Sequence, residues 1–416
     1  MEVGGRERET ASGWGNKSLY ICTTESKLDF RTRYAIHSIK LSDLLSLDEK
    51  RDDTSKGDHS DASKSKFKSK SKSNSCGGLQ KVVAIYNDHV PRGMSCGVFG
   101  SQILFAGGTN FRPSGLEVSK KIYVFETDPT VDPNPSLKEF EPGFLESKGE
   151  PFLVELEGNL YALSGIYEGS PTFEVFSKFP KRDPPFFEGY FCCGGCHTYL
   201  SIAVAGTKIL VSCPKNPKVF CFDVAKHRYL GEWTILSGSD CGLPFIGKTL
   251  VLDLDDTSDD KVLFTYQFIH SNVRKDNSED WGIVPYRMSI NDSESSISIN
   301  PIKTEHLRRA VVPTEFWGVA TTHSFVHLGG RKVCCVIARH IKQDEDDDWM
   351  SNNQDDGNKI RLAFLTFRFQ FSGTSKSDDG DGFSAKILST RIFEYDCSKE
   401  ADAATYHATL AGCFLR

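Results

Sequence analysis

The sequence concentrates its most reactive side chains in one short segment, FCCGGCH, at residues 191–197. Cys193 and Cys196 form a Cys-x-x-Cys pair and His197 follows directly, so three side chains that can bind zinc stand together. A tetrahedral zinc site needs four ligands, and the sequence offers no second Cys-x-x-Cys pair. The same string also matches c-type haem attachment, which requires export to a haem-loading compartment. We therefore predict no metal and no cofactor, with Cys193, Cys196 and His197 as the nearest candidates for a metal site.

Other patterns that carry enzymatic chemistry are missing from the sequence. No P-loop, HExxH, GxSxG or dinucleotide-binding string occurs. His323 and His327 are four residues apart, a spacing that places both on one face of a strand, and we interpret them as parts of a half-buried strand. We therefore predict no catalytic residues and a protein that is not an enzyme.

Composition indicates the cellular compartment and the classes of partner that we expect for this protein. The chain has 416 residues, a net charge of −6 and 13 cysteines, and its first residues contain no apolar leader. No run of 18 apolar residues occurs, so we expect no membrane association. Unpaired cysteines without a secretion signal predict a reducing compartment, the cytoplasm or the nucleus. The basic run KSKFKSKSKS lacks interleaved aromatic strands, so we do not expect nucleic-acid binding.

Several polar segments interrupt the chain and are too poor in apolar groups to offset the entropy of ordering. We predict a disordered N-terminus at residues 1–17, followed by one β-domain at residues 18–416. Within that domain the predicted flexible inserts are residues 49–75, 272–280, 343–358 and 372–382.

One pattern recurs along the domain: a β-rich run, a turn glycine and a second β-rich run. It is centred on Gly100, Gly158, Gly206, Gly247, Gly329 and Gly412. A recurring unit of about 40–50 residues with several short strands is typical of a propeller blade. The last unit stops after CFLR, and the N-terminal strands SLYICTT and RYAIHSIKL could complete it. We therefore predict an all-β, six-bladed propeller whose first and last strands share one blade.

The stretch MSCGVFGSQILFAGGTN, followed by KKIYVFETD, resembles a kelch repeat. Tyr229 and Trp233 resemble the aromatic pair of the outer kelch strand. The whole chain resembles the plant kelch and galactose-oxidase-like propeller families, although it shows no F-box-like segment. The resemblance implies a kelch-like propeller, and its motifs are specific only over residues 94–127.

A propeller gathers the loops between blades and the loops between second and third strands on one face. The side chains that we expect to contact a partner there are Arg92, Arg112, Tyr167, Tyr190, Lys215 and Trp317. Arginine, tyrosine and tryptophan are the side chains most often found as interface anchors. We therefore predict a non-catalytic protein-interaction module. The alternatives are a substrate-recognition subunit of a ubiquitin ligase, and an enzyme or small-ligand binder that uses the central channel.

Overall fold

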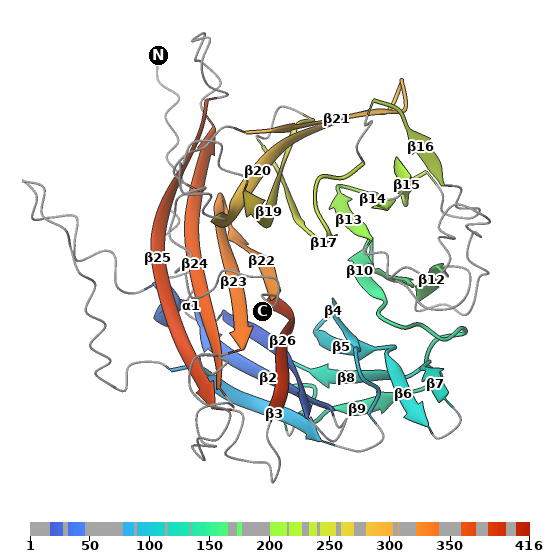
Figure 1. Ribbon diagram of the computed structural model, residues 1–416, viewed down its shortest axis with the longest axis vertical. Helices are drawn as coiled ribbons and strands as arrows, with labels where there is room; N and C mark the ends of the chain where they lie inside the picture. The colour runs from blue at the N-terminus through green and yellow to red at the C-terminus, as the bar shows by residue number, and fades with distance from the viewer. Residues whose placement is uncertain are drawn as a thin grey trace, which may run out of the picture.

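A computed structural model describes the chain as a ring of β-sheets (Figure 1). The described residues are 17–27, 32–45, 78–86, 90–112, 115–133, 135–164, 173–176, 200–213, 216–226, 233–238, 242–254, 259–269, 280–302, 307, 322–340, 359–371, 382–396 and 405–416. The predicted inserts lie almost wholly outside this part, except that Asp280 begins a strand and Gly382 is described. None of the described helices is long and apolar enough to cross a membrane.

Six sheets form the blades, which confirms the predicted six-bladed propeller. In each blade the first strand named is the innermost and the last is the outermost. Blade 1 is β26 (Thr405–Leu415), β1 (Ser18–Lys27), β2 (Thr32–Lys40) and β3 (Gln80–Tyr86). Blade 2 is β4 (Ser95–Phe99), β5 (Gln102–Ala106), β8 (Ile122–Glu126) and β9 (Lys138–Phe140). Blade 3 is β10 (Phe152–Leu156), β11 (Asn159–Leu163) and β12 (Phe173–Phe176). Blade 4 is β17 (Gly247–Lys248), β13 (Ser201–Ala205), β14 (Lys208–Cys213), β15 (Asn216–Asp223) and β16 (Thr234–Leu236). Blade 5 is β18 (Leu250–Asp253), β19 (Lys261–Ile269), β20 (Asp280–Asn291) and β21 (Ser296–Pro301). Blade 6 is β22 (Thr322–Gly329), β23 (Lys332–His340), β24 (Lys359–Phe371) and β25 (Phe383–Asp396). The helix α1 (Leu41–Leu45) follows β2, and the hairpin β6 (Thr109–Arg112) and β7 (Gly115–Val118) stands between β5 and β8.

The two ends of the chain pair with each other in blade 1, as predicted. β26 lies antiparallel to β1, and the red and blue strands of Figure 1 meet there. Ser18 N donates to Arg416 O at 2.6 Å, and Arg416 N donates to Ser18 O at 2.9 Å. The ring is therefore closed by backbone hydrogen bonds between the chain ends, and β26 supplies the inner strand that β1 lacks.

Four of the six predicted turn glycines lie at or beside a turn between two neighbouring antiparallel strands of one blade. Gly100, Gly158, Gly206 and Gly329 all have positive φ, which glycine adopts without steric cost. The predictions for the other two were wrong. Gly247 lies in β17, which pairs in parallel with β13 of blade 4, and the first two strands of blade 5 are β18 and β19. Gly412 lies inside the single strand β26.

Successive side chains of the blade strands pack against opposite neighbouring blades, because strand side chains alternate between the two faces of a sheet. In β1, Leu19 and Ile21 join the core shared with blade 6, whereas Cys22 joins the core shared with blade 2. In β2, Tyr34 and Ile36 likewise face blade 2. The hydrophobic core is thus divided among the interfaces between blades.

Blades 2 and 3 approach each other closely at Gly97 of β4. A Cβ atom at this position would lie 2.5 Å from the Cβ atom of Leu153 in β10, closer than two carbon atoms can pack. Gly97 is therefore required by the packing of two inner strands and not by an unusual φ.

We predict that Gly97→Ala lowers the free energy of unfolding by roughly 1–3 kcal/mol, because the added methyl group overpacks this interface. Gly78→Ala is the matched control, since nothing lies within 4 Å of the atom that it adds. Denaturant unfolding of both variants measures the effect. Equal midpoints for the two variants would contradict the packing explanation.

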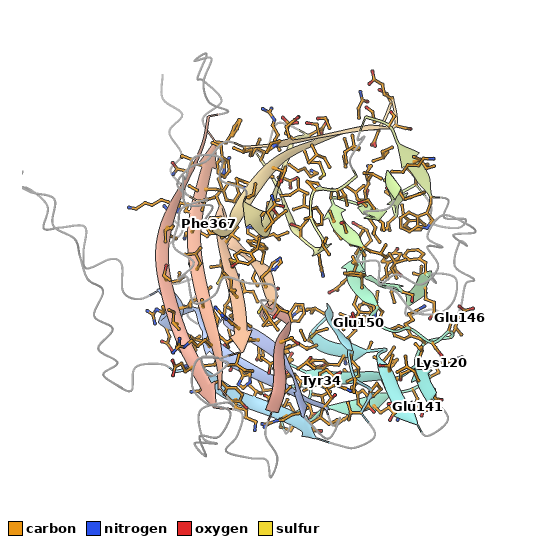
Figure 2. The ribbon with its side chains drawn as sticks, in the orientation of Figure 1. Tyr34, Lys120, Glu141, Glu146, Glu150 and Phe367 are labelled. Carbon is orange, nitrogen blue, oxygen red and sulfur yellow. The ribbon has the colours of Figure 1, made fainter. Side chains whose placement is uncertain are left out.

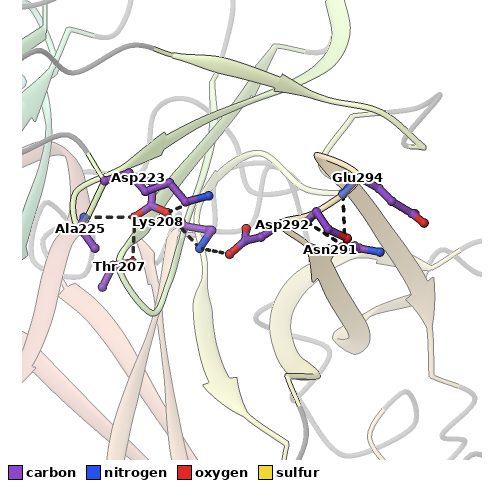
Figure 3. Close-up of polar contacts among 9 residues, drawn as sticks. Thr207, Lys208, Asp223, Ala225, Asn291, Asp292 and Glu294 are labelled. Atoms are coloured by element: carbon purple, nitrogen blue, oxygen red, sulfur yellow. Dashed lines mark hydrogen bonds and ion pairs between the residues drawn. The ribbon is translucent and has the colours of Figure 1, made fainter.

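Blades 4 and 5 are joined by a lysine that binds two carboxylates (Figure 3). Lys208 Nζ lies 3.2 Å from Asp223 of its own blade and 3.2 Å from Asp292, in the turn between β20 and β21. Thr207 Oγ1 also donates to Asp223, at 2.9 Å. Desolvation opposes ionisation of Asp223, but the hydrogen bonds from Thr207 and Lys208 outweigh it and lower the pKa of this carboxyl.

The lowered pKa predicts how stability depends on pH. Asp223 stabilises the fold above its unfolded-state pKa, near the ordinary value of 3.8, and this contribution is lost as pH falls through the lower folded-state pKa. Asp223→Asn should therefore be less stable than the native protein at about pH 7, with the difference shrinking towards about pH 2.5. Urea unfolding at the two pH values measures this change. A difference that does not depend on pH, or an equal effect of Asp292→Asn, whose side chain is 53% exposed, would contradict the assignment.

Candidate functional site

Two of the predicted contact residues lie at opposite ends of the β6–β7 hairpin. Arg92, in the segment between blades 1 and 2, pairs with Thr109 at the base, with N···O distances of 2.8 and 2.7 Å. Arg112 ends β6 and pairs with Gly115 at the tip. The remaining predicted site residues, Tyr167, Tyr190, Lys215, Trp317, Cys193, Cys196 and His197, lie outside the described residues.

The base of the hairpin is formed by Gly107 and Gly108, the double glycine of the kelch-like motif. Both have positive φ. A Cβ on Gly107 would lie 2.5 Å from Lys148 O, and one on Gly108 would lie 2.4 Å from Arg92 O. Two neighbouring segments therefore approach the backbone so closely that only glycine fits, and the motif marks the point where the hairpin joins its blade.

The segment at residues 141–150, which leads from blade 2 to blade 3, is bonded to the residues that follow the hairpin. Phe144 N donates to Lys120 O and Lys148 N donates to Ser119 O, both at 2.9 Å. Lys120 Nζ donates to Leu145 O at 2.5 Å. Figure 2 shows Lys120 and Glu146 together at the edge of the ring, whereas Glu150 lies nearer its centre. These bonds hold the segment in a fixed position beside the hairpin.

A buried ion pair joins this segment to blade 3. Lys148 Nζ lies 3.2 Å from Glu174 of β12, and both side chains are almost completely shielded from solvent. Glu174 also accepts hydrogen bonds from Leu145 N at 3.1 Å and Glu146 N at 2.8 Å. Burial lowers the pKa of Lys148, and the charge of Glu174 partly restores it. The pair therefore ties the segment to blade 3.

The incoming segment at residues 90–94 is held by a buried tyrosine of blade 1. Tyr34 Oη donates to Pro91 O at 2.7 Å and accepts a hydrogen bond from Met94 N at 2.8 Å. Burial raises the pKa of Tyr34, so its hydroxyl stays protonated and keeps both bonds. Tyr34, Lys148 and Glu174 were not singled out by the sequence, because no local motif joins them to the segments that they hold.

Large apolar side chains remain exposed on this scaffold. Leu116 of β7 is 46% exposed, Phe140 at the end of β9 is 44% exposed, and Leu145 is 43% exposed. The carboxylate residues Glu117 and Glu141 are exposed beside them. We call the β6–β7 hairpin together with Phe140 and residues 141–150 the hairpin surface. It combines a hydrogen-bonded backbone with apolar side chains that are partly exposed to solvent.

The other reactive groups of the described chain are placed for packing. No group of three or more His, Cys, Asp or Glu residues within the described ranges could hold a metal ion. Burial raises the pKa of Cys334 to about 12 and of Cys221 to about 11, so these thiols stay protonated and unreactive. His323 packs against Tyr266 and Phe325, and burial lowers its pKa to about 4.

The fold and this scaffold define a six-bladed β-propeller with one elaborated blade. A family model described as a protein of unknown function, DUF1668, matches residues 16–255, which is more than half of the chain. The chain therefore belongs to the DUF1668 family. The kelch resemblance is confirmed only as far as the six-bladed architecture.

Solved structures with similar folds share little sequence with the chain. YjhT is 8% identical, with a TM-score of 0.37, and the match covers 68% of this chain and 84% of YjhT. A proposed 6-phosphogluconolactonase from Bacteroides fragilis is 9% identical, with a TM-score of 0.35 and coverage of 96% and 98%. Apo AztD from Citrobacter koseri is 6% identical, with a TM-score of 0.31 and coverage of 95% and 97%. No curated protein matches the sequence.

We predict that Glu174→Gln destabilises the protein by about 3–5 kcal/mol, because it removes the buried carboxylate that pairs with the Lys148 ammonium. It should also speed hydrogen exchange at the Leu145 and Glu146 amides, which donate to Glu174. The control is Glu139→Gln in the exposed pair with Lys121, which should cost less than about 1 kcal/mol. Denaturant unfolding and amide exchange measure both effects, and equal costs for the two variants would refute the prediction.

Proposed function

We propose that this protein is a non-catalytic binding module whose hairpin surface contacts a partner protein. The observation that carries the proposal is the exposure of Leu116, Phe140 and Leu145. The backbone beside them is held by hydrogen bonds to Glu174 and by the buried ion pair between Glu174 and Lys148. An apolar group gains free energy when a partner removes it from water, at about 25 cal/mol per Å². A fixed backbone adds to the affinity, because little conformational entropy remains to be lost on binding.

The distribution of exposed apolar groups supports this location. Half of the eight large apolar side chains that are exposed in the described residues belong to blade 2 and the segment that follows it. They are Leu116, Val131, Phe140 and Leu145. Val131 follows β8, at the end of that strand opposite to the hairpin, so the candidate patch is formed by the other three. Grouped apolar side chains are characteristic of interaction sites, whereas single exposed ones are common on any surface.

The surrounding charges favour a particular kind of partner. Glu117, Glu141 and Glu146 are exposed around the apolar groups, while the Lys120 ammonium is occupied by the Leu145 carbonyl. We therefore propose a partner segment that carries apolar side chains flanked by basic ones, because opposite charges favour encounter and register. Arg92 and Arg112 belong to the same proposal, at the base and the tip of the hairpin.

The free thiols support a reducing environment for this interaction. Cys22, Cys96, Cys221, Cys334, Cys335 and Cys413 are all unpaired. We propose that the protein works in the cytoplasm or the nucleus, where thiols stay reduced. The roles of ubiquitin-ligase receptor and of channel enzyme stay predictions from the sequence.

The proposal predicts that Leu116→Ser combined with Leu145→Ser removes a partner without unfolding the protein. Affinity purification with quantitative mass spectrometry should show at least one protein depleted about tenfold relative to the native bait. The same purified protein should bind the variant with an affinity about tenfold weaker.

The matched control is Ile235→Ser combined with Ile392→Ser. These side chains are both 43% exposed but lie on the outer strands β16 and β25, away from the hairpin surface. The control should keep the full set of partners. If both double variants retrieve the same proteins as the native chain, the hairpin surface is not the binding site.

A further inference from the structure

The last two strands of blade 6 extend beyond the core that they share with blade 1. β24 has 13 residues and β25 has 14, and both run along one side of the ring in Figure 1. On the face of β24 that is turned towards blade 1, Leu362 and Phe364 belong to the shared core, and Thr366 is also buried. The next two side chains on that face, Arg368 and Gln370, are exposed. This end of the sheet therefore presents one face to solvent.

Three basic residues stand in register across the exposed end of blade 6. Lys332 of β23 is opposite Arg368 of β24, and Arg368 is opposite Lys386 of β25. Residues that are directly opposite in antiparallel strands place their side chains on the same face, with Cβ atoms about 4.5–5.5 Å apart. Arg368 and Lys386 are exposed, and Lys332 is half-buried. We call these three residues the basic row.

The basic row places like charges side by side, an arrangement that destabilises a pair of strands. Lys332 and Lys386 have contacts of their own, whereas the Arg368 side chain makes no hydrogen bond or ion pair with any part of the described chain. Its guanidinium group lies between two positive charges, so a negative charge that is brought to it gains from all three. The basic row therefore becomes favourable when an acidic group binds to it.

The surroundings of the basic row favour carboxylate groups over nucleic acid. Gln370 is opposite Ser384, one residue pair beyond the row on the same face, and both are exposed. Their amide and hydroxyl groups donate hydrogen bonds that carboxylate oxygens accept. The aromatic rings nearby, Phe367 and Phe369, belong to the core shared with blade 5, so this face has no rings on which bases could stack. The net charge of −6 also opposes the approach of a long polyanion.

We propose that the basic row binds an acidic protein segment in an extended conformation, with its carboxylate side chains on Lys332, Arg368 and Lys386. Alternate residues of an extended segment lie on one side of it, so an acidic residue at every second position presents several carboxylates to this face. The partner of the hairpin surface carries basic side chains, so the two surfaces suit partners of opposite charge. The basic row belongs to blade 6 and does not depend on the function proposed for blade 2.

The test is fluorescence anisotropy at low ionic strength with a labelled peptide in which glutamate alternates with serine. The native protein should bind this peptide saturably, and added salt should weaken the binding because it screens exposed charges. Arg368→Gln combined with Lys386→Gln should weaken binding at least about tenfold. The matched control, Arg361→Gln combined with Lys226→Gln, removes the same charge and should stay within about twofold of the native affinity. Arg361 pairs with Glu394 at the other end of β24, and Lys226 follows β15 of blade 4.

A single variant separates loss of binding from loss of folding. Arg368→Gln should unfold in denaturant at the native midpoint or above it, because it removes repulsion between like charges, and should still weaken binding at least about threefold. Absence of saturable binding to the native protein would overturn the proposal, and so would an equal loss in the control, because net charge alone would then explain it.

A labelled oligothymidylate tests the other class of acidic partner. It should bind more weakly than the glutamate peptide. Tighter binding that is lost in the Arg368 and Lys386 double variant would assign the basic row to nucleic acid and overturn the proposal of a protein segment. None of these results bears on the Leu116 and Leu145 variants, which test the hairpin surface separately.

Discussion

The pairing of β26 with β1 is the interaction on which the rest of the structure depends. The hydrogen bonds between Ser18 and Arg416 join the two ends of the chain, and β26 then contacts both β22 and β4. Without that strand, blade 1 would present β1 as an open edge, and the interfaces with blades 2 and 6 would lose their inner strand. Closure is therefore a condition for burial at both interfaces of blade 1.

The interfaces that closure completes are apolar, but polar contacts within them specify how the blades meet. Between blades 1 and 6, Arg33 of β2 donates a hydrogen bond to Tyr395 Oη of β25 at 3.3 Å, and the His37 ring lies 4.4 Å from that of Tyr395. A sliding movement between the two blades would leave such groups buried without partners, which is costly. Polar contacts thus favour one alignment of surfaces that hydrophobic packing alone would leave less specific.

The inner strands of the blades form the ring, whereas the candidate functional surface lies on an element that is added to this ring. The hairpin surface belongs to an element added to a regular blade, the β6–β7 hairpin. Backbone bonds hold this element, so its exposed groups stay in place while contributing little to the core. An addition of this kind can vary in sequence without disturbing ring closure, which depends on the inner strands.

The sequence by itself determined the repeating units, because a turn glycine between two β-rich runs is a local feature that sets a hairpin wherever it occurs. Gly100, Gly158, Gly206 and Gly329 were predicted for this reason, and together with Gly247 and Gly412 they gave the count of six blades. Gly247 and Gly412 were misinterpreted, since whether a glycine turns the chain or lies within a strand depends on partners distant in sequence. Only the tertiary structure brought Lys148 to Glu174, because contacts between blades leave no regular spacing in the chain.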